Sequence, residues 1–146
     1  MKTALAVCAL LGLTACSLAT VPKPTATATL HWHTVQLKLG SYCWSSGGQG
    51  ECADSAGADA LLRTGYLVPE RTAGCQSAVI KFSTEPKTFE VELAYSTTGK
   101  TGSVASEDHA FDIGSTPGTY VYVITGTWSE GDVGFYLPLE IIPGCE

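Results

Sequence analysis

The stretch TYVYVITGTWSEGDVGFYLPLEII, residues 119–142, decides the fold that the sequence predicts. Its first part, up to Trp128, is apolar on both parities, which is typical of a central strand covered on both faces. SEGD, residues 129–132, suits a tight turn. In the last part alternate residues are apolar and would share one strand face: Val133, Phe135, Leu137, Leu139 and Ile141. The stretch therefore predicts a long antiparallel hairpin.

Pro138 interrupts the second strand of this hairpin on the opposite parity. Proline has no backbone N–H to donate to a neighbouring strand, so within sheets it is confined to edges and bulges. We therefore expect this strand to lie at a sheet edge or to contain a bulge.

Apolar runs before the hairpin predict further short strands. They are LHWHTVQLKL (30–39), SAVIKF (77–82), TFEVELAY (88–95) and a weaker HAFDI (109–113). In TFEVELAY an apolar side alternates with Glu90 and Glu92, which should therefore face solvent. That apolar side holds Phe89, Val91, Leu93 and Tyr95.

One segment, ADSAGADALLRTG at residues 53–65, carries helical signals instead. Asp54 or Ser55 is a candidate N-cap, and Gly65 is a candidate stop. Short strands at this spacing, with one short helix after the first strand, predict an all-β fold. The expected architecture is an immunoglobulin-like antiparallel β-sandwich.

The N-terminus has the features of an export signal. A single Lys2 precedes an apolar run from Ala4 to Leu13 that is too short to span a bilayer. The motif LTAC, ending at Cys16, resembles a bacterial lipobox. That resemblance implies cleavage before Cys16, thioether lipidation of this cysteine, and acylation of its new amino group by a chain such as palmitate. The alternatives are a secretory peptide cut elsewhere or an uncleaved N-terminal helix.

These observations predict three parts of the chain. Residues 1–15 would be the lipoprotein signal peptide. Residues 16–29, rich in Ala, Thr and Pro, would be the lipidated cysteine and an extended tether. Residues 30–146 would form one β-sandwich domain, since a mature chain of this size fits a single core.

Charge restricts the class of partner. The chain has eight basic and fourteen acidic residues, and loss of Lys2 leaves seven against fourteen, a formal net charge of about −7. No run of Lys or Arg is present. Nucleic acid is therefore not expected, because phosphate binding needs clustered cations. The membrane is expected as a partner through the lipid anchor alone.

The cysteine count predicts two disulfides in an oxidising compartment. With Cys8 removed and Cys16 lipidated, Cys43, Cys52, Cys75 and Cys145 remain. Three connectivities are possible. The glycine-rich stretch GSYCWSSGGQGECAD (40–54) makes Cys43–Cys52 easy to close, which leaves Cys75–Cys145. In the chain-entropy description the two bridges contribute about 2.7 and about 4.4 kcal/mol.

The same stretch has two other readings, a metal site and a redox site. Its C-x8-C spacing differs from the close pairs of structural zinc sites and from the C-x-x-C of thioredoxin-type sites. Unbroken strand alternation would place Cys43 in the core and turn Tyr42 and Trp44 outward as ligand-contact candidates. The alternative is a bulge at Gly40 that turns both rings into the core.

Histidines offer a weaker metal-binding hypothesis. His31 and His33 would share one face of a strand at i and i+2, a spacing that can chelate copper or zinc. His109, in the acidic stretch EDHAFD, is a possible third ligand. Solvated or edge histidines are the simpler interpretation, and we expect no cofactor.

No catalytic constellation is evident. A G-x-S-x-G motif is absent, and the spacing of Ser, His and Asp singles out no set of residues. We therefore expect a protein that is not an enzyme.

The chain resembles a known pattern in several features. They are GSYCW, a second cysteine in CAD, a short helix, and a PGTY-to-Trp strand followed by one ending in LEI. The pattern is that of small lipoproteins and secreted proteins of Bacillus-like bacteria, and the resemblance covers roughly residues 35–142. It implies an immunoglobulin-like domain. Cys75 and Cys145 depart from the pattern, as does the SSGGQGE insert, and no catalytic residue carries over.

The sequence as a whole predicts a lipid-anchored extracytoplasmic module of the bacterial cell envelope. It would bind a protein, a peptide or an envelope polymer, or serve a structural role. The alternatives are a metal-handling lipoprotein that uses His31 and His33, and an inhibitor of an extracellular protease that presents exposed loops.

Overall fold

The structure is a computed structural model that describes residues 20–31 and 33–145. Strands dominate it, and one short helix follows the fourth strand. In chain order the elements are β1 (Ala26–Leu30), β2 (His33–Gln36), β3 (Lys38–Ser46), β4 (Gln49–Ala53), α1 (Ala58–Arg63), β5 (Glu70–Gly74), β6 (Ser77–Phe82), β7 (Thr88–Ser96), β8 (Gly102–Val104), β9 (Ser106–Glu107), β10 (Ala110–Asp112), β11 (Gly118–Thr127) and β12 (Gly131–Cys145).

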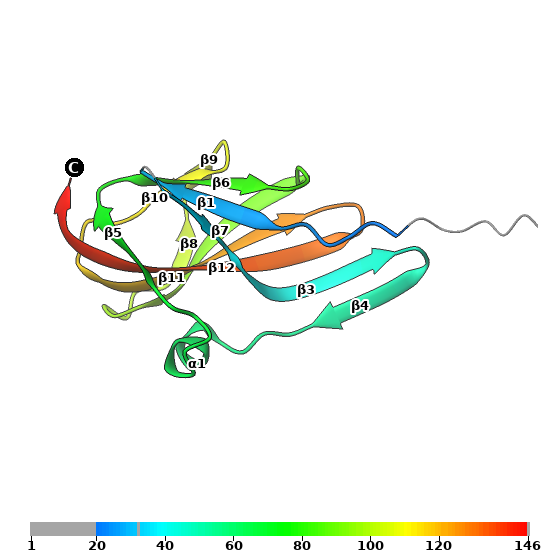
Figure 1. The fold of residues 1–146 in the computed structure, drawn as a ribbon, viewed down its shortest axis with the longest axis horizontal. Coiled ribbons are helices and arrows are strands. Elements are labelled where there is room, and N and C mark those ends of the chain that lie inside the picture. Colours follow the sequence, from blue (N-terminus) through cyan, green and yellow to red (C-terminus); the bar gives the residue numbers. More distant parts are fainter. Residues whose placement is uncertain (1–19, 32, 146) are drawn as a thin grey trace, which may run out of the picture.

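Two sheets pack face to face (Figure 1). The first has the order β2-β1-β6-β10-β9, and the second has the order β4-β3-β12-β11-β7-β8. All these pairings are antiparallel, whereas β5 joins the second sheet by pairing in parallel with β12. The predicted class, an all-β sandwich of immunoglobulin-like type, is confirmed.

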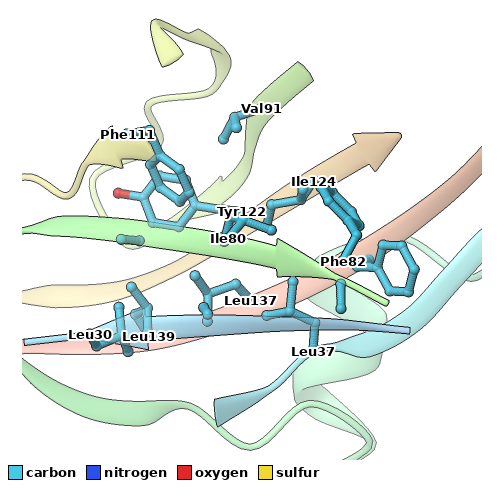
Figure 2. Packing of buried hydrophobic residues seen from close by; sticks show 14 of the residues in the cluster. Leu30, Leu37, Ile80, Phe82, Val91, Phe111, Tyr122, Ile124, Leu137 and Leu139 are labelled. Carbon is cyan, nitrogen blue, oxygen red and sulfur yellow. The ribbon is translucent and has the colours of Figure 1, made fainter. Parts of the chain in front are cut away.

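The core lies between the sheets and is filled by apolar side chains from strands of both sheets (Figure 2). Every residue that alternation assigned to the inner face of β12 is less than 3 % exposed, as expected for a central strand. β1 and β6 supply the facing layer. The labelled members in Figure 2 are Leu30, Leu37, Ile80, Phe82, Val91, Phe111, Tyr122, Ile124, Leu137 and Leu139.

Of the two alternatives predicted for the strand that contains Pro138, the edge position is wrong, because β12 is a central strand. β12 does contain an irregularity, a register shift against β5 between Ile142 and Cys145, but it lies beyond Pro138. β11 pairs with one side of β12 over its whole length. On the other side β3 pairs with β12 as far as Tyr136, and β5 pairs with β12 from Leu139 onward. Trp128 N–H donates to Gly131 O, so by alternation the nitrogen of Pro138 faces away from β11. The proline therefore occupies the junction where one neighbouring strand has ended and the next begins.

β7 follows the predicted alternation only in its first half. Phe89, Val91 and Leu93 contact the core, and both glutamates are exposed. A bulge next to Leu93 then shifts the register against β11. Tyr95 consequently packs on the outer face of the sheet, so its predicted place beside Val91 is wrong.

α1 forms a partial third layer on that outer face. Leu61 and Leu62 pack against a second apolar cluster that includes Val121 and Tyr136. The helix is shorter than predicted, and Gly57 is its N-cap in place of Asp54 or Ser55. It follows β4 and not the first strand, because residues 30–39 turn and cross between sheets where one continuous strand was predicted.

The sandwich begins earlier than the predicted boundary at residue 30. β1 starts at Ala26, and its residues Ala26, Ala28 and Leu30 are almost fully buried. Alternating Ala and Thr gave the segment the composition of a tether, yet alternation of a small apolar with a polar residue also suits a half-buried strand. Residues 26–29 therefore belong to the domain.

Gly131 permits the close approach of β12 to β3. Its φ is 148°, and a Cβ there would lie 1.9 Å from the carbonyl oxygen of Cys43. We expect Gly131→Ala to lower the free energy of unfolding by about 2 kcal/mol or more, measured by urea denaturation. Gly114→Ala is the control, because a Cβ at Gly114 meets no atom within 4 Å. Equal effects of the two substitutions would contradict the prediction.

Candidate functional site

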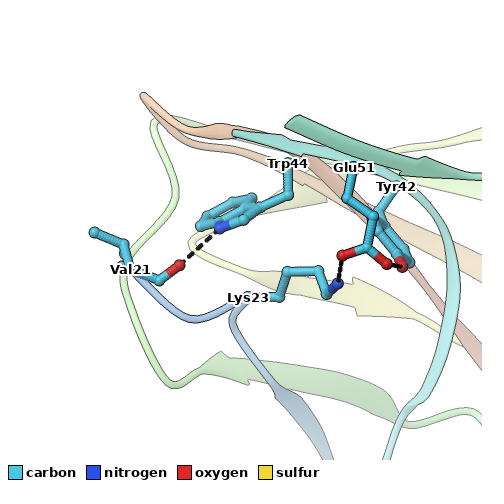
Figure 3. A network of polar contacts seen from close by, with 5 residues as sticks. All are labelled: Val21, Lys23, Tyr42, Trp44 and Glu51. Atoms are coloured by element: carbon cyan, nitrogen blue, oxygen red, sulfur yellow. Dashed lines mark hydrogen bonds and ion pairs between the residues drawn. The ribbon is translucent and has the colours of Figure 1, made fainter. Parts of the chain in front are cut away.

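The β3–β4 hairpin holds the chain that precedes β1. Trp44 Nε1–H donates to Val21 O at 2.9 Å, and Val21 N–H donates to the Ser46 hydroxyl. Pro24 is buried between them and the start of β1. We call Val21, Lys23, Tyr42, Trp44 and Glu51 the N-terminal clamp (Figure 3).

A polar triad completes the clamp. Lys23 Nζ lies 2.7 Å from Glu51 Oε2 and 4.0 Å from the centroid of the Tyr42 ring. Tyr42 donates its hydroxyl proton to Glu51 Oε1 at 2.5 Å. The hydrogen bond from Lys23, and then that from Tyr42, lowers the pKa of Glu51, while the bond to Glu51 raises the pKa of Lys23. Glu51 is exposed, and Lys23 and Tyr42 are only half-buried, so solvent screens the ion pair and the triad orients the segment more than it stabilises the fold.

Tyr42 and Trp44 are therefore clamp residues and not a free contact surface. The β3–β12 register shifts at Gly40 and Ser41, which reverses the predicted facing. Trp44 is 7 % exposed and packs edge-on against Trp128 at 5.9 Å, Tyr42 is half-buried, and Cys43 faces out. The Gly40 bulge is the alternative that the structure shows. A Cβ at Gly40 would lie 2.9 Å from the Tyr136 ring, which explains the glycine.

A small cleft lies beside the clamp. Its volume is about 200 Å³, and it is lined by Val21, Pro22, Trp44 and Trp128 with Lys87 and Glu130. Sites for small organic ligands are usually about 300–1,000 Å³. We therefore do not assign a ligand to this cleft.

Both predicted disulfides are present. Cys43 and Cys52 are directly opposite each other on β3 and β4, with Cα atoms 4.1 Å apart. Cys75 and Cys145 join the segment after β5 to the end of β12, which pair in parallel. The first bridge therefore holds the clamp hairpin closed, and the second fixes the C-terminal strand against β5.

The histidines do not form the predicted chelating pair. His31 lies in the turn between β1 and β2 with φ 52°, and His33 begins β2, so they do not share a face of one strand. His109 follows Asp108 in another turn, and its Nε2 lies 3.3 Å from Glu85 Oε1. Within the described residues no cluster of three or more His, Cys, Asp or Glu side chains could hold a metal ion.

A groove lies where β12 changes neighbours. We call it the seam groove; its volume is about 330 Å³, and its lining includes Thr34, Val35, Gln36, Val68, Leu137 and Pro138. Lys38 and Glu70 give it one charge of each sign. Val68 is 70 % exposed, the highest value among the large apolar side chains that the structure describes as exposed. Tyr66, two residues before Val68, is 50 % exposed and donates a long hydrogen bond to Leu39 O at 3.4 Å.

The edge of β2 adds unpaired backbone to the seam groove. Leu37 N–H donates to Ala26 O, so alternation along the β1–β2 pair turns the N–H and C=O groups of Thr34 and Gln36 away from β1. In the part of the chain that the structure describes, β2 has no second neighbouring strand. The groove thus combines apolar side chains with a strand edge that can pair.

Sequence reasoning missed this groove. Pro138 was the one available signal, since its missing N–H marks a break in strand pairing. Nothing in the sequence around Tyr66 and Val68 distinguishes them from core residues.

Two further findings concern the predicted association with a membrane. Cys16 falls in the part of the chain that is not described, so its lipidation stays a prediction. Among the described residues no helix has the length and apolar character needed to cross a bilayer.

Comparison with known proteins gives no match: no protein family, no curated protein and no solved structure is significantly similar to this chain.

The clamp predicts a specific change in the titration of Glu51. Lys23→Gln removes the main cause of its lowered pKa, and Tyr42→Phe removes the second. Both variants should raise the Glu51 pKa, Lys23→Gln by more, as measured by NMR titration of its carboxyl carbon. Because the pKa of Glu51 is lower in the folded state than in the unfolded state, its ionised carboxylate stabilises the fold at pH values above the unfolded-state pKa. This contribution is lost as the pH falls through the folded-state pKa. An unchanged pKa in Lys23→Gln, or a rise in the control Lys87→Gln, would contradict the assignment.

The two disulfides should differ in their contribution to stability. Replacing Cys75 and Cys145 together by alanine is expected to lower the free energy of unfolding by about 4 kcal/mol, against about 3 kcal/mol for Cys43 and Cys52, because it frees the longer loop. Urea denaturation of both double variants measures this. A larger loss from the Cys43 and Cys52 pair would show that the clamp hairpin carries more of the stability than chain entropy assigns to it.

Proposed function

We propose that this chain is a lipid-anchored extracytoplasmic binding module of the cell envelope and catalyses no reaction. Its contact surface is the seam groove, and its partner is an extended segment of another polypeptide. The resemblance of LTAC, ending at Cys16, to a lipobox and the signal-like segment before it support the anchor. Two disulfides in one small domain support an oxidising, extracytoplasmic location.

The observation that supports this function most directly is that apolar side chains and unpaired backbone groups occur together in the seam groove. Val68 and Val35 offer apolar area, while Thr34 and Gln36 present backbone donors and acceptors spaced as in a strand. An extended peptide satisfies both, because it can pair with the β2 edge and place alternate side chains in the groove. A glycan would leave the regularly spaced amide groups without matching partners, so a polypeptide fits better.

The clamp residues support the same assignment by elimination. Tyr42 and Trp44, the aromatic candidates from sequence, are engaged in holding the N-terminal segment. Among the described residues the exposed large apolar side chains are Val21, Leu39, Tyr66, Val68 and Val79. Val68, the most exposed of these five side chains, lines the seam groove, which makes the groove the apolar surface that we assign to a partner.

Site-specific photo-crosslinking in cells that produce the full chain tests this function. A photo-reactive residue at Val68 should give a discrete adduct whose added mass is removed by protease digestion, as expected for a polypeptide partner. The matched control is the same residue at Val79, which is 48 % exposed but lies on β6, away from the groove. Equal adducts at both positions, no adduct at Val68, or an adduct that resists protease and yields to glycan hydrolysis would overturn the proposal.

A further inference from the structure

The clamp sets how far the sandwich can stand from a lipid attached to Cys16. Five residue steps separate Cys16 from Val21, and a fully extended chain of that length spans at most about 18 Å. Val21 itself is fixed, because its N–H and C=O are both bonded to the β3–β4 hairpin. The tether is therefore much shorter than residues 16–29 suggest, since Pro24 and β1 already belong to the packed domain.

The elements around the clamp form one end of the sandwich, which we call the N-terminal end. It comprises residues 20–25, the β3–β4 turn, the β6–β7 loop at 83–87 and the β11–β12 turn. Lys87 belongs to it, since its N–H donates to Thr127 O and its side chain lines the cleft beside Trp44. Figure 1 shows the described chain starting at this end and the C-terminus lying at the other.

Lys100 marks the opposite end. It lies in the turn between β7 and β8, where Ser96 pairs with Tyr120 and donates its hydroxyl proton to Lys100 O. Ten residues of β11 run between the two ends, a length of about 30 Å. Lys87 and Lys100 are both exposed, so they report on the two ends without any substitution.

We propose that the N-terminal end is a membrane-apposed surface, so that the sandwich stands upright on the lipid headgroups with its opposite end directed away. This inference rests on the proposed anchor at Cys16. The partner of this surface is the headgroup layer of the anchoring membrane itself. The seam groove, on the side of the sandwich near Pro138, then remains accessible from the aqueous phase.

Charge does not supply the contact between the N-terminal end and the headgroups. The N-terminal end carries Lys23 and Lys87 against Glu51, Glu85 and Glu130, so it has no excess of cations to attract anionic lipids. The mature chain, with a formal net charge of about −7, is repelled by an anionic leaflet and gains nothing by lying flat on it. The short tether alone therefore imposes the proximity, which should persist at high salt.

Headgroup crosslinking of the native lysines tests the orientation. The full chain, purified from membranes, is first weighed to establish acylation and is then reconstituted into phosphatidylcholine vesicles that contain a phospholipid with an amine-reactive headgroup. Peptide mass spectrometry measures lipid adducts on each lysine. We expect Lys87 to be modified about tenfold more than Lys100, because the tether holds it at high effective concentration near the surface. The ratio should be the same at 0.1 M and 1 M salt.

A spacer variant provides the matched control. Inserting twenty Gly and Ser residues between Ala19 and Thr20 adds a coil of about 25 Å and should bring the Lys87 to Lys100 ratio close to one. An acylated protein with equal modification of Lys87 and Lys100 would overturn the orientation while leaving the anchor standing. A protein without acyl mass would overturn both the anchor and the orientation that rests on it.

Discussion

The pairing of β12 with three neighbours is the constraint on which the rest of the structure depends. On one side β11 pairs along its full length, and on the other side β3 and β5 share it in succession. Pro138 lies at the change of neighbour, where the missing N–H costs no ladder hydrogen bond. β3 extends from β12 toward the N-terminal end and carries the clamp, whereas β5 extends toward the opposite end and meets the Cys75–Cys145 bridge. The seam groove is the space left between them.

Much of this fold could be predicted from the sequence because alternation is strong where strands are long. The inner face of β12, the central position of β11 and the exposure of Glu90 and Glu92 all follow from period-two patterning. Local patterning does not report bulges, however. One bulge beside Leu93 and another at Gly40 each reverse the facing of the residues beyond them, and these reversals account for the wrong predictions at Tyr95 and for the outward reading of Tyr42 and Trp44.

The site was less predictable than the fold for a related reason. Cysteine pairing could be predicted because the short glycine-rich loop restricts which partners meet, and the two predicted bridges are present. The seam groove, by contrast, arises from the spatial meeting of β2, β5 and β12, which lie far apart in the sequence. No local pattern around Val68 distinguishes a valine left exposed by a gap in a sheet from one buried in a core. Of the two alternatives predicted for the strand of Pro138, an edge position or a bulge, the edge position is wrong, because an internal change of neighbours satisfies the same chemical requirement.

The two disulfides and the clamp brace different ends of the sandwich. At the N-terminal end the Cys43–Cys52 bridge fixes the hairpin whose Trp44 holds Val21, so the chain leaves the domain in one defined place. At the opposite end the Cys75–Cys145 bridge joins two strands that are already neighbours, which restrains the C-terminus from fraying. The binding role that we propose for the β2 edge requires a rigid frame, because a partner strand gains little if the edge must first be ordered. Bracing both ends of the sandwich while leaving its side unpaired meets that requirement.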